Sequence, residues 1–201
     1  RRWSLVHWIM CRVADRIYNE SIIRFLRDGV FRIYIPGTVF IQEKMDGAQG
    51  ATDFIGLNYY SRMHVKGHLN SREPFTFAKR EQDVMTDMGY PVYAEGLYRA
   101  LKTISILGVP IYVTENGLAD DTDEIRPTFI KRYLYALNRA LRDRIDVRGY
   151  FYWSLIDNFE WAEGYKMKFG LYDVDFETQK RVLREGSMPF IEMVNKQSAD
   201  K

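Results

Sequence analysis

The spacing of apolar residues along the chain predicts several helices. Residues 12–29 place apolar side chains near one face at helical spacing, and Gly29 is a suitable residue to end such a helix. A second helix is predicted over residues 94–107, before a glycine. A third is predicted over residues 126–144, with Pro127 in its first turn, where proline is well tolerated.

Short, nearly continuous apolar runs predict strands between these helices. The runs cover residues 53–60, 110–116 and 148–156, and their β-branched and aromatic content is typical of buried strands. A short strand and turn follow over residues 169–181, and a terminal helix is expected to begin near Ser187. These apolar runs alternate with the predicted helices along the chain, so we expect an α/β fold with parallel strands buried on both faces.

The segment 61–92 is polar and lacks clear periodicity, so we expect an extended surface loop there. Neither an internal repeat nor a low-complexity linker interrupts the sequence, and residues 1–201 are expected to belong to a single domain.

The ends of the predicted strands carry polar and aromatic residues. Asn58 and Tyr60 end the first strand, Glu115 ends the second, and the segment 153–160 ends and follows the third. Ligands bind at the carboxyl ends of parallel strands, so these residues form a candidate site. Taken alone, the Asn-Gly pair after Glu115 also fits an ordinary hairpin turn, which would make the glutamate a simple polar turn residue.

Composition excludes several classes of protein. The chain has 201 residues, 46% hydrophobic and 15% aromatic, which is typical of a folded globular chain. Its net charge of +2 is spread without basic blocks, so no nucleic-acid partner is expected. No apolar run approaches the roughly 20 residues that span a bilayer, and no signal peptide is predicted. The single cysteine, Cys11, excludes an internal disulfide, and the default expectation is a cytoplasmic location.

Four motifs in a fixed order give a more specific indication. They are "DFIGLNYY", "IYVTENG", "GYFYWSLIDNFEW" and "KFGLYDVDFETQKR", spread over about 120 residues. In order and separation they resemble the carboxyl-terminal part of glycoside hydrolase family 1, the β-glucosidase-like retaining enzymes. The likeness runs from about residue 12 to about residue 185. It implies a (β/α)8 TIM barrel fold, of which this chain would hold about the last three βα units.

The resemblance implies roles for three residues at the strand ends. Glu115 would be the catalytic nucleophile, a carboxylate that attacks the anomeric carbon of a β-glycoside. Tyr60 matches the family's tyrosine that hydrogen-bonds this nucleophile, and a phenol donor favours and orients a charged carboxylate. Asn58 matches the asparagine beside it. Tyr60 and Asn58 could each instead be a polar residue that finishes a strand.

The loop after the third strand resembles the sugar-holding loop of the family. Glu160 would accept hydrogen bonds from two sugar hydroxyls, and Trp161 would offer its indole N–H to a neighbouring hydroxyl. Trp153 would present an apolar platform to the sugar ring, and Phe169 would close the wall of the site. The alternative for the tryptophans is a core or wall position with their N–H groups satisfied internally.

Glu160 also separates two substrate classes. Family members that act on 6-phosphorylated sugars have a small residue there with cations nearby, so a glutamate favours a neutral sugar. Lys166 and Lys168 keep the 6-phospho-β-glucosidase alternative open. No metal or organic cofactor is implied, and the i,i+4 pair His64 and His68 is expected to be no metal site because it lacks an obvious third ligand.

The sequence also departs from the family. In the family, the general acid/base lies in a T-F-N-E-P segment, and this sequence has no such segment. The glutamine, histidine and tryptophan of the family's early strands are missing too. Tyr90 and Ala94 stand where tryptophan and proline are usual. Because the sequence begins with Arg1 and holds only three of eight strands, we expect a fragment that is inactive alone, with a complementary amino-terminal half-barrel chain as a candidate partner.

Two interpretations of function follow from these observations. The first is hydrolysis of β-glycosidic bonds, with a β-glycoside or oligosaccharide as substrate. The second is a non-catalytic sugar-binding or protein-interaction module that kept the sugar-holding residues and lost the acid/base.

Overall fold

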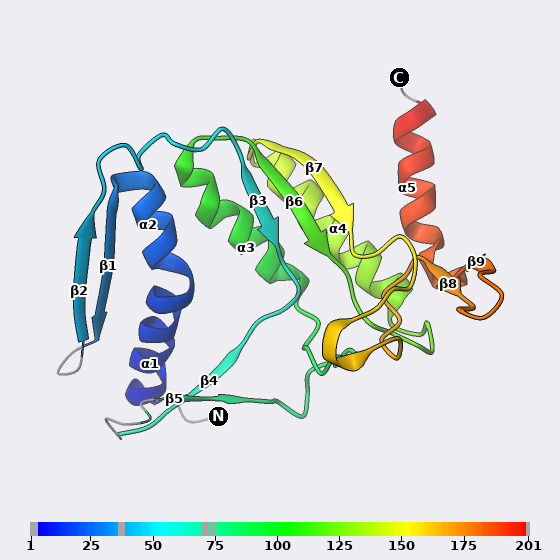
Figure 1. The fold of residues 1–201 in the computed structure, drawn as a ribbon, viewed down its shortest axis with the longest axis horizontal. Coiled ribbons are helices and arrows are strands. Elements are labelled where there is room, and N and C mark those ends of the chain that lie inside the picture. Colours follow the sequence, from blue (N-terminus) through cyan, green and yellow to red (C-terminus); the bar gives the residue numbers. More distant parts are fainter. Residues whose placement is uncertain (1–3, 36–38, 70–72, 74, 200–201) are drawn as a thin grey trace. The chain divides into compact units, whose positions relative to one another are not determined.

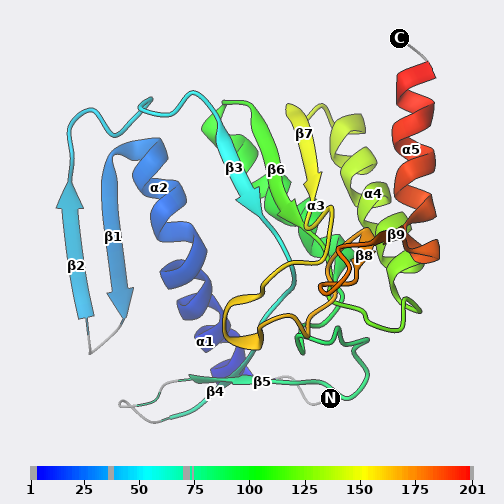
Figure 2. The same ribbon diagram turned by 45° about the vertical axis from the view of Figure 1, so that its right-hand side comes forward.

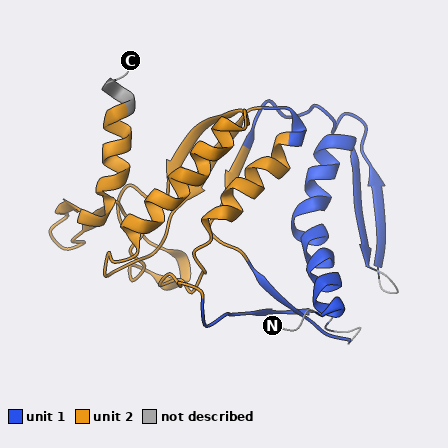
Figure 3. Ribbon diagram, turned by 180° about the vertical axis from the view of Figure 1, so that it is seen from behind, with its two compact units in different colours: residues 1–55, 63–82, 106–109 blue, residues 56–62, 83–105, 110–201 orange. Residues whose placement is uncertain are grey.

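The structure is a computed structural model, and it describes residues 4–35, 39–69, 73 and 75–199; Arg1 lies outside them. The chain divides into two compact units (Figure 3). Unit 1 comprises residues 1–55, 63–82 and 106–109, and unit 2 comprises residues 56–62, 83–105 and 110–201. The predicted site residues all belong to unit 2.

A three-stranded sheet forms the centre of unit 2. Its strands are β3 (Ile55–Asn58), β6 (Ile111–Asn116) and β7 (Val147–Tyr152), in the order β3-β6-β7. The pair β6 and β7 is parallel, and the arrows of all three strands run in the same direction (Figure 1). The three strands predicted from apolar runs are therefore confirmed, with β7 ending four residues earlier than expected.

Two helices cover one face of this sheet (Figures 1 and 2). They are α3 (Ala94–Ile104), continued by a 3-10 turn over Ser105–Leu107, and α4 (Arg126–Arg142), which has proline in its first turn. Leu97 and Leu101 of α3 and Val113 of β6 are fully buried, so the core lies between the helices and the sheet. Burial of such side chains contributes about 1.5–3 kcal/mol each.

The opposite face of the sheet is more open than predicted. Asn58, Thr114 and Phe151 are exposed, the last by 57%. The expectation of a sheet buried on both faces is therefore wrong for this chain. The physical reason is that α3 and α4 pack on the same face, so alternate residues of each strand point away from them.

The end of unit 2 holds a small hairpin and the last helix. Strands β8 (Tyr172–Val174) and β9 (Arg181–Leu183) pair antiparallel, as the predicted strand and turn suggested. A 3-10 turn over Glu185–Ser187 leads into α5 (Met188–Ala199), close to the predicted start. A further 3-10 turn, Trp161–Glu163, lies in the loop after β7.

Unit 1 differs most from the sequence-based prediction. Its helical part consists of α1 (Leu5–Asp15), a π-helical turn (Arg16–Glu20) and α2 (Ser21–Asp28), so the helix begins earlier than residue 12 and ends at Gly29 as expected. Two antiparallel pairs complete the unit: β1 (Val30–Ile35) with β2 (Val39–Lys44), and β4 (His64–Gly67) with β5 (Phe75–Ala78).

The pair β4 and β5 corrects the expectation of a structureless loop over residues 61–92. Each strand has only four residues, and short half-exposed strands give little periodicity in the sequence. Among the described residues, no helix has the length and apolarity needed to cross a membrane.

Candidate active site

Glu115 and Tyr60 meet where strands β6 and β3 end. The hydroxyl of Tyr60 donates a hydrogen bond to Oε2 of Glu115 over 2.6 Å. The backbone joins the same two segments, because the amide of Tyr59 donates to the carbonyl oxygen of Glu115 over 2.9 Å. Glu115 therefore has a fixed backbone and a charge-assisted donor on its side chain, which together aim the carboxylate.

The environment of Tyr60 keeps its phenol protonated. Burial raises the pKa of Tyr60 well above its usual value, and the hydrogen bond to Glu115 and the negative charges of Glu115 and Glu160 raise it further. Tyr60 thus remains a hydrogen-bond donor at neutral pH.

Asn116, which the sequence did not identify as a site residue, joins all three strands at this edge. Its side chain is fully buried, its Nδ2 donates to the carbonyl oxygen of Tyr59 over 2.6 Å, and its Oδ1 accepts from the hydroxyl of Tyr150 over 2.7 Å. Its own carbonyl oxygen accepts from the amide of Trp153 over 3.0 Å. The residue next to Glu115 therefore fixes where β6 ends relative to β3 and β7.

The hairpin interpretation of the Asn-Gly pair is wrong, because β6 pairs with β3 and β7 and forms no hairpin within the described chain. Gly117 is required for a different reason. A Cβ atom at this position would collide with the carbonyl oxygen of Trp153. The glycine allows the backbone after Glu115 to pass directly beside the segment that follows β7.

The remaining sugar-site candidates are arranged around this pair in different ways. Asn58 is exposed, and its Oδ1 accepts a hydrogen bond from the hydroxyl of Thr114 over 2.6 Å. Phe169 is only 3% exposed, and its ring lies edge-on to Tyr60 with ring centroids 6.3 Å apart. Phe169 therefore packs against Tyr60, the tyrosine that hydrogen-bonds Glu115. Trp153 is half-buried and directly follows β7.

The loop after β7 places Glu160 and Trp161 differently from each other. One carboxylate oxygen of Glu160, Oε2, is buried and has no hydrogen-bond partner among the described residues. Trp161 has a positive φ of 45° and is 81% exposed. Among the described residues, the indole N–H of Trp161 has no internal hydrogen-bond partner, which was the alternative considered for it. The Oε2 atom of Glu160, in contrast, is an acceptor that lacks a donor among these residues.

Lys166 and Lys168, the cations that kept the phosphate alternative open, are not equivalent. The ammonium of Lys168 lies 3.8 Å from Oδ2 of Asp157 and 5.3 Å from the ring centroid of Phe176, whereas Lys166 is exposed. Lys168 is thus engaged by the protein itself.

Asp157, in the segment that follows β7, is buried and connects this segment to residues further along the chain. It is 2% exposed, and its carboxylate accepts from the amide of Gly170 and from the guanidinium of Arg184, each over 2.8 Å. A buried charge of this kind is stable only with such partners.

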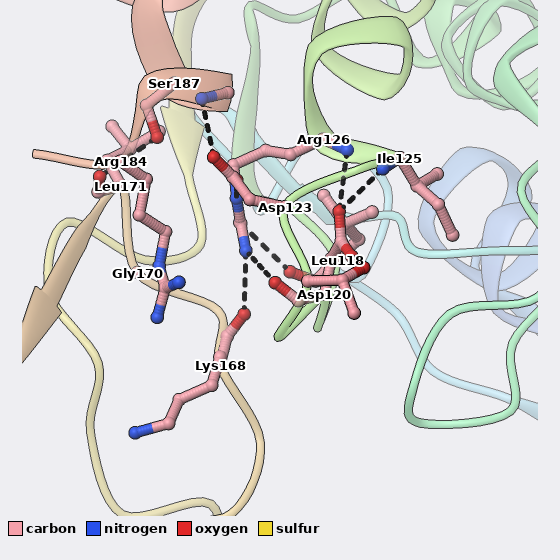
Figure 4. Close-up of polar contacts among 12 residues, drawn as sticks. Leu118, Asp120, Asp123, Ile125, Arg126, Lys168, Gly170, Leu171, Arg184 and Ser187 are labelled. Carbon is pink, nitrogen blue, oxygen red and sulfur yellow. Dashed lines mark hydrogen bonds and ion pairs between the residues drawn. The ribbon is translucent and has the colours of Figure 1, made fainter.

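A second buried charge, Arg126, lies at the first position of α4 (Figure 4). Its side chain is 0% exposed, and its Nε donates to Oδ1 of Asp123 over 2.6 Å. Burial acts to lower the pKa of Arg126, but Tyr152 and Asp123 outweigh it and raise that pKa. The nearby Asp120 caps the helix by accepting from the amides of Ile125 and Arg126, each over 2.8 Å.

Comparisons with known proteins show to which family the chain is similar. Residues 3–199 match the family described as "Glycosyl hydrolase family 1". The chain is 38% identical over 193 residues to a β-galactosidase of Pyrococcus woesei, covering 87% of this chain and 37% of that protein. It is 36% identical over 179 residues to β-glucosidase A of Thermotoga maritima, covering 84% of this chain and 38% of that protein.

Solved structures give the same result. A β-glycosidase from Pyrococcus horikoshii superposes with a TM-score of 0.76 at 38% identity, covering 88% of this chain and 40% of that one. The β-glucosidase of Thermotoga maritima in complex with azafagomine superposes with a TM-score of 0.68 at 35% identity, covering 74% of this chain and 36% of that one. These neighbours are (β/α)8 barrels, and this chain aligns with only part of them. It spans about two fifths of their length, and it belongs to glycosyl hydrolase family 1.

Proposed function

We propose that this chain provides the nucleophile half of a retaining β-glycosidase. The observation that carries the proposal is the Tyr60–Glu115 hydrogen bond of 2.6 Å at the ends of adjacent strands. A nucleophile must be rigidly aimed, and this condition follows from a phenol donor on a carboxylate whose backbone is fixed by its neighbours. Family membership, with relatives described as β-glucosidases and β-galactosidases, supports the same reaction class.

In the proposed reaction, an oxygen of Glu115 attacks the anomeric carbon while the bond from that carbon to the leaving oxygen breaks. The resulting glycosyl ester of Glu115 is then hydrolysed by water, which restores the carboxylate. A second carboxyl about 5–5.5 Å away protonates the leaving oxygen and then activates the water. We propose that a complementary amino-terminal half-barrel supplies this acid/base together with the remaining strands.

Glu160 supports a neutral sugar as the substrate of this site. Its buried Oε2 lacks a donor among the described residues, and a buried carboxylate oxygen without a donor costs free energy. Sugar hydroxyls would supply the missing donors as charge-assisted hydrogen bonds. A phosphate would instead bring a second negative charge beside the carboxylate, which is unfavourable. We therefore propose unphosphorylated β-glucosides or β-galactosides as the substrate class.

Trapping of the glycosyl-enzyme tests the proposal. The chain is incubated with 2,4-dinitrophenyl 2-deoxy-2-fluoro-β-glucoside, whose good leaving group needs little acid assistance, and the labelled peptide is mapped by mass spectrometry. We expect the label on Glu115, its loss in Glu115→Gln, and slower labelling in Glu160→Gln. The matched control is Glu163→Gln, an exposed glutamate of the same loop, which should label like the parent chain.

Two results would contradict the proposal. A label on another residue would exclude Glu115 as the nucleophile. A well-folded chain that binds the sugar without any label would favour the sugar-binding module. If circular dichroism shows that the chain alone is poorly folded, the same experiment is made after co-expression with the amino-terminal part of a family member, and the same two results decide.

A further inference from the structure

Arg126 lies outside the sugar site, yet it joins the two loops that build it. Its Nη2 donates to the carbonyl oxygens of Asp120, over 2.8 Å, and Lys168, over 3.0 Å. Its Nη1 donates to the carbonyl oxygens of Leu118, over 3.4 Å, and Phe169, over 3.3 Å. One guanidinium group thus bridges the loop that follows Glu115 on β6 and the end of the loop that follows β7 (Figure 4).

The same guanidinium also contacts strand β7 itself. Its Nη1 lies 3.0 Å from the hydroxyl of Tyr152, the last residue of that strand. The hydroxyl oxygen of Tyr152 accepts this hydrogen bond, and burial raises the pKa of the same phenol. The five N–H groups of a guanidinium have a fixed fork geometry, so acceptors in three segments can be served at once only if those segments keep one arrangement.

A short chain of contacts leads from Arg126 to Glu115. The carbonyl oxygen of Phe169 is held by the guanidinium and by the amide of Ser154, and the Phe169 ring lies edge-on to Tyr60, with an interplanar angle of 83°. Tyr60 in turn donates to Glu115. A shift of residues 168–170 would therefore move the aromatic wall behind Tyr60 and admit water to its hydrogen bond.

We propose that Arg126 is a positioning residue for the nucleophile, acting by fixing Phe169 behind Tyr60. This proposal rests on the proposed function. A lysine at the same position keeps the charge but offers one compact ammonium in place of the planar fork, so it cannot hold all of these carbonyl oxygens. Arg126→Lys is therefore expected to loosen residues 168–170 without removing the positive charge beside the partly exposed carboxylate of Asp123.

The first measurement is independent of catalysis. The hydroxyl proton of Tyr60, in a short hydrogen bond to a carboxylate, should give a downfield resonance that exchanges slowly with water and is absent in Tyr60→Phe. In Arg126→Lys we expect this resonance to move upfield and to exchange about tenfold faster. The matched control is Arg148→Lys, an exposed arginine of β7 whose side chain is 57% accessible, which should leave the resonance unchanged.

The second measurement is the rate at which Glu115 is labelled by the 2-fluoroglucoside. A positioning role lowers the maximal rate of labelling, by about tenfold, with little change in the concentration of reagent that gives half of this rate. Tyr60→Phe should lower the same maximal rate, and Arg126→Lys should add little in a Tyr60→Phe background because both changes act on one contact chain.

The outcomes separate the two proposals. A folded Arg126→Lys protein with an unchanged Tyr60 resonance overturns the positioning role, whatever the labelling shows. A displaced resonance in a chain whose parent form never labels refutes the proposed function while the contact chain to Tyr60 is upheld. If Arg126→Lys does not fold, Phe169→Leu replaces it, and an unchanged Tyr60 resonance in that variant also overturns the proposal.

Discussion

Replacement of Asn116 by alanine should destabilise the sheet that carries Glu115. The Asn116 side chain is fully buried and makes two hydrogen bonds, to the carbonyl oxygen of Tyr59 and from the hydroxyl of Tyr150. Alanine leaves both partners buried without a replacement, at about 1–3 kcal/mol each. Together with the small cavity, we expect a loss of about 4 kcal/mol in the local unfolding free energy.

Hydrogen exchange measured by mass spectrometry is the suitable assay, because the chain divides into two units and a single unfolding transition is not guaranteed. The reporter peptide covers strand β7, Val147–Tyr152, which pairs with β6. Its protected amides should exchange several hundred-fold faster in Asn116→Ala. The matched control is Asn138→Ala, an exposed asparagine of α4, which should change the exchange less than about twofold.

A double-mutant cycle with Tyr150→Phe makes the argument specific. Tyr150 and Asn116 share one hydrogen bond of 2.7 Å, so the two changes should be non-additive by about 1 kcal/mol. The prediction is refuted if Asn116→Ala lowers the local unfolding free energy no more than the Asn138→Ala control does. It is also refuted if the effects of Asn116→Ala and Tyr150→Phe simply add, because Asn116 would then not connect the three strands through this hydrogen bond.

Three further predictions concern the same unit. Gly117→Ala should destabilise it by about 3 kcal/mol, measured by the same exchange assay, because the new Cβ would meet the carbonyl oxygen of Trp153. Asp157→Asn should cost about 3 kcal/mol in that assay by leaving the guanidinium of Arg184 without its buried partner; a cost below about 1 kcal/mol would contradict this. Burial raises the pKa of Tyr133 to about 12 against a usual 10.0, so stability from this group is complete below pH 10 and is lost between about pH 10 and pH 12. Tyr133→Phe should reduce the loss of unfolding free energy between about pH 10 and pH 12 by about 2–3 kcal/mol. An unchanged loss in this variant would show that this phenol is not the titrating group.

The sheet of unit 2 could be predicted from the sequence because its signals are local. Three apolar runs of strand length alternate with helices whose ends carry Pro127 or a glycine, and each signal acts within a few residues. The pairs β1–β2 and β4–β5 could not be predicted in the same way. Their strands are half exposed, and their pairing depends on partners rather than on an alternating pattern.

The candidate site shows the same division. Tyr60 and Glu115 could be proposed because each stands at a strand end, where parallel sheets place their functional groups. Asn116 was visible in the sequence only as half of a turn signal. Arg126 looked like one basic residue among many at the start of a helix. Its burial depends on acceptors more than forty residues away, which no local pattern encodes.

The groups that the sequence concealed share a physical purpose. Loops around a substrate site must leave one side open, so they cannot be held by apolar burial alone. Here Asn116, Arg126 and Asp157 are each at most 2% exposed, and each joins segments that are distant in the chain. Buried polar groups stabilise little on balance, but a misplaced one is costly, so they select a single arrangement. A nucleophile that must be aimed to within about half an ångström requires such selectivity more than it requires additional stability.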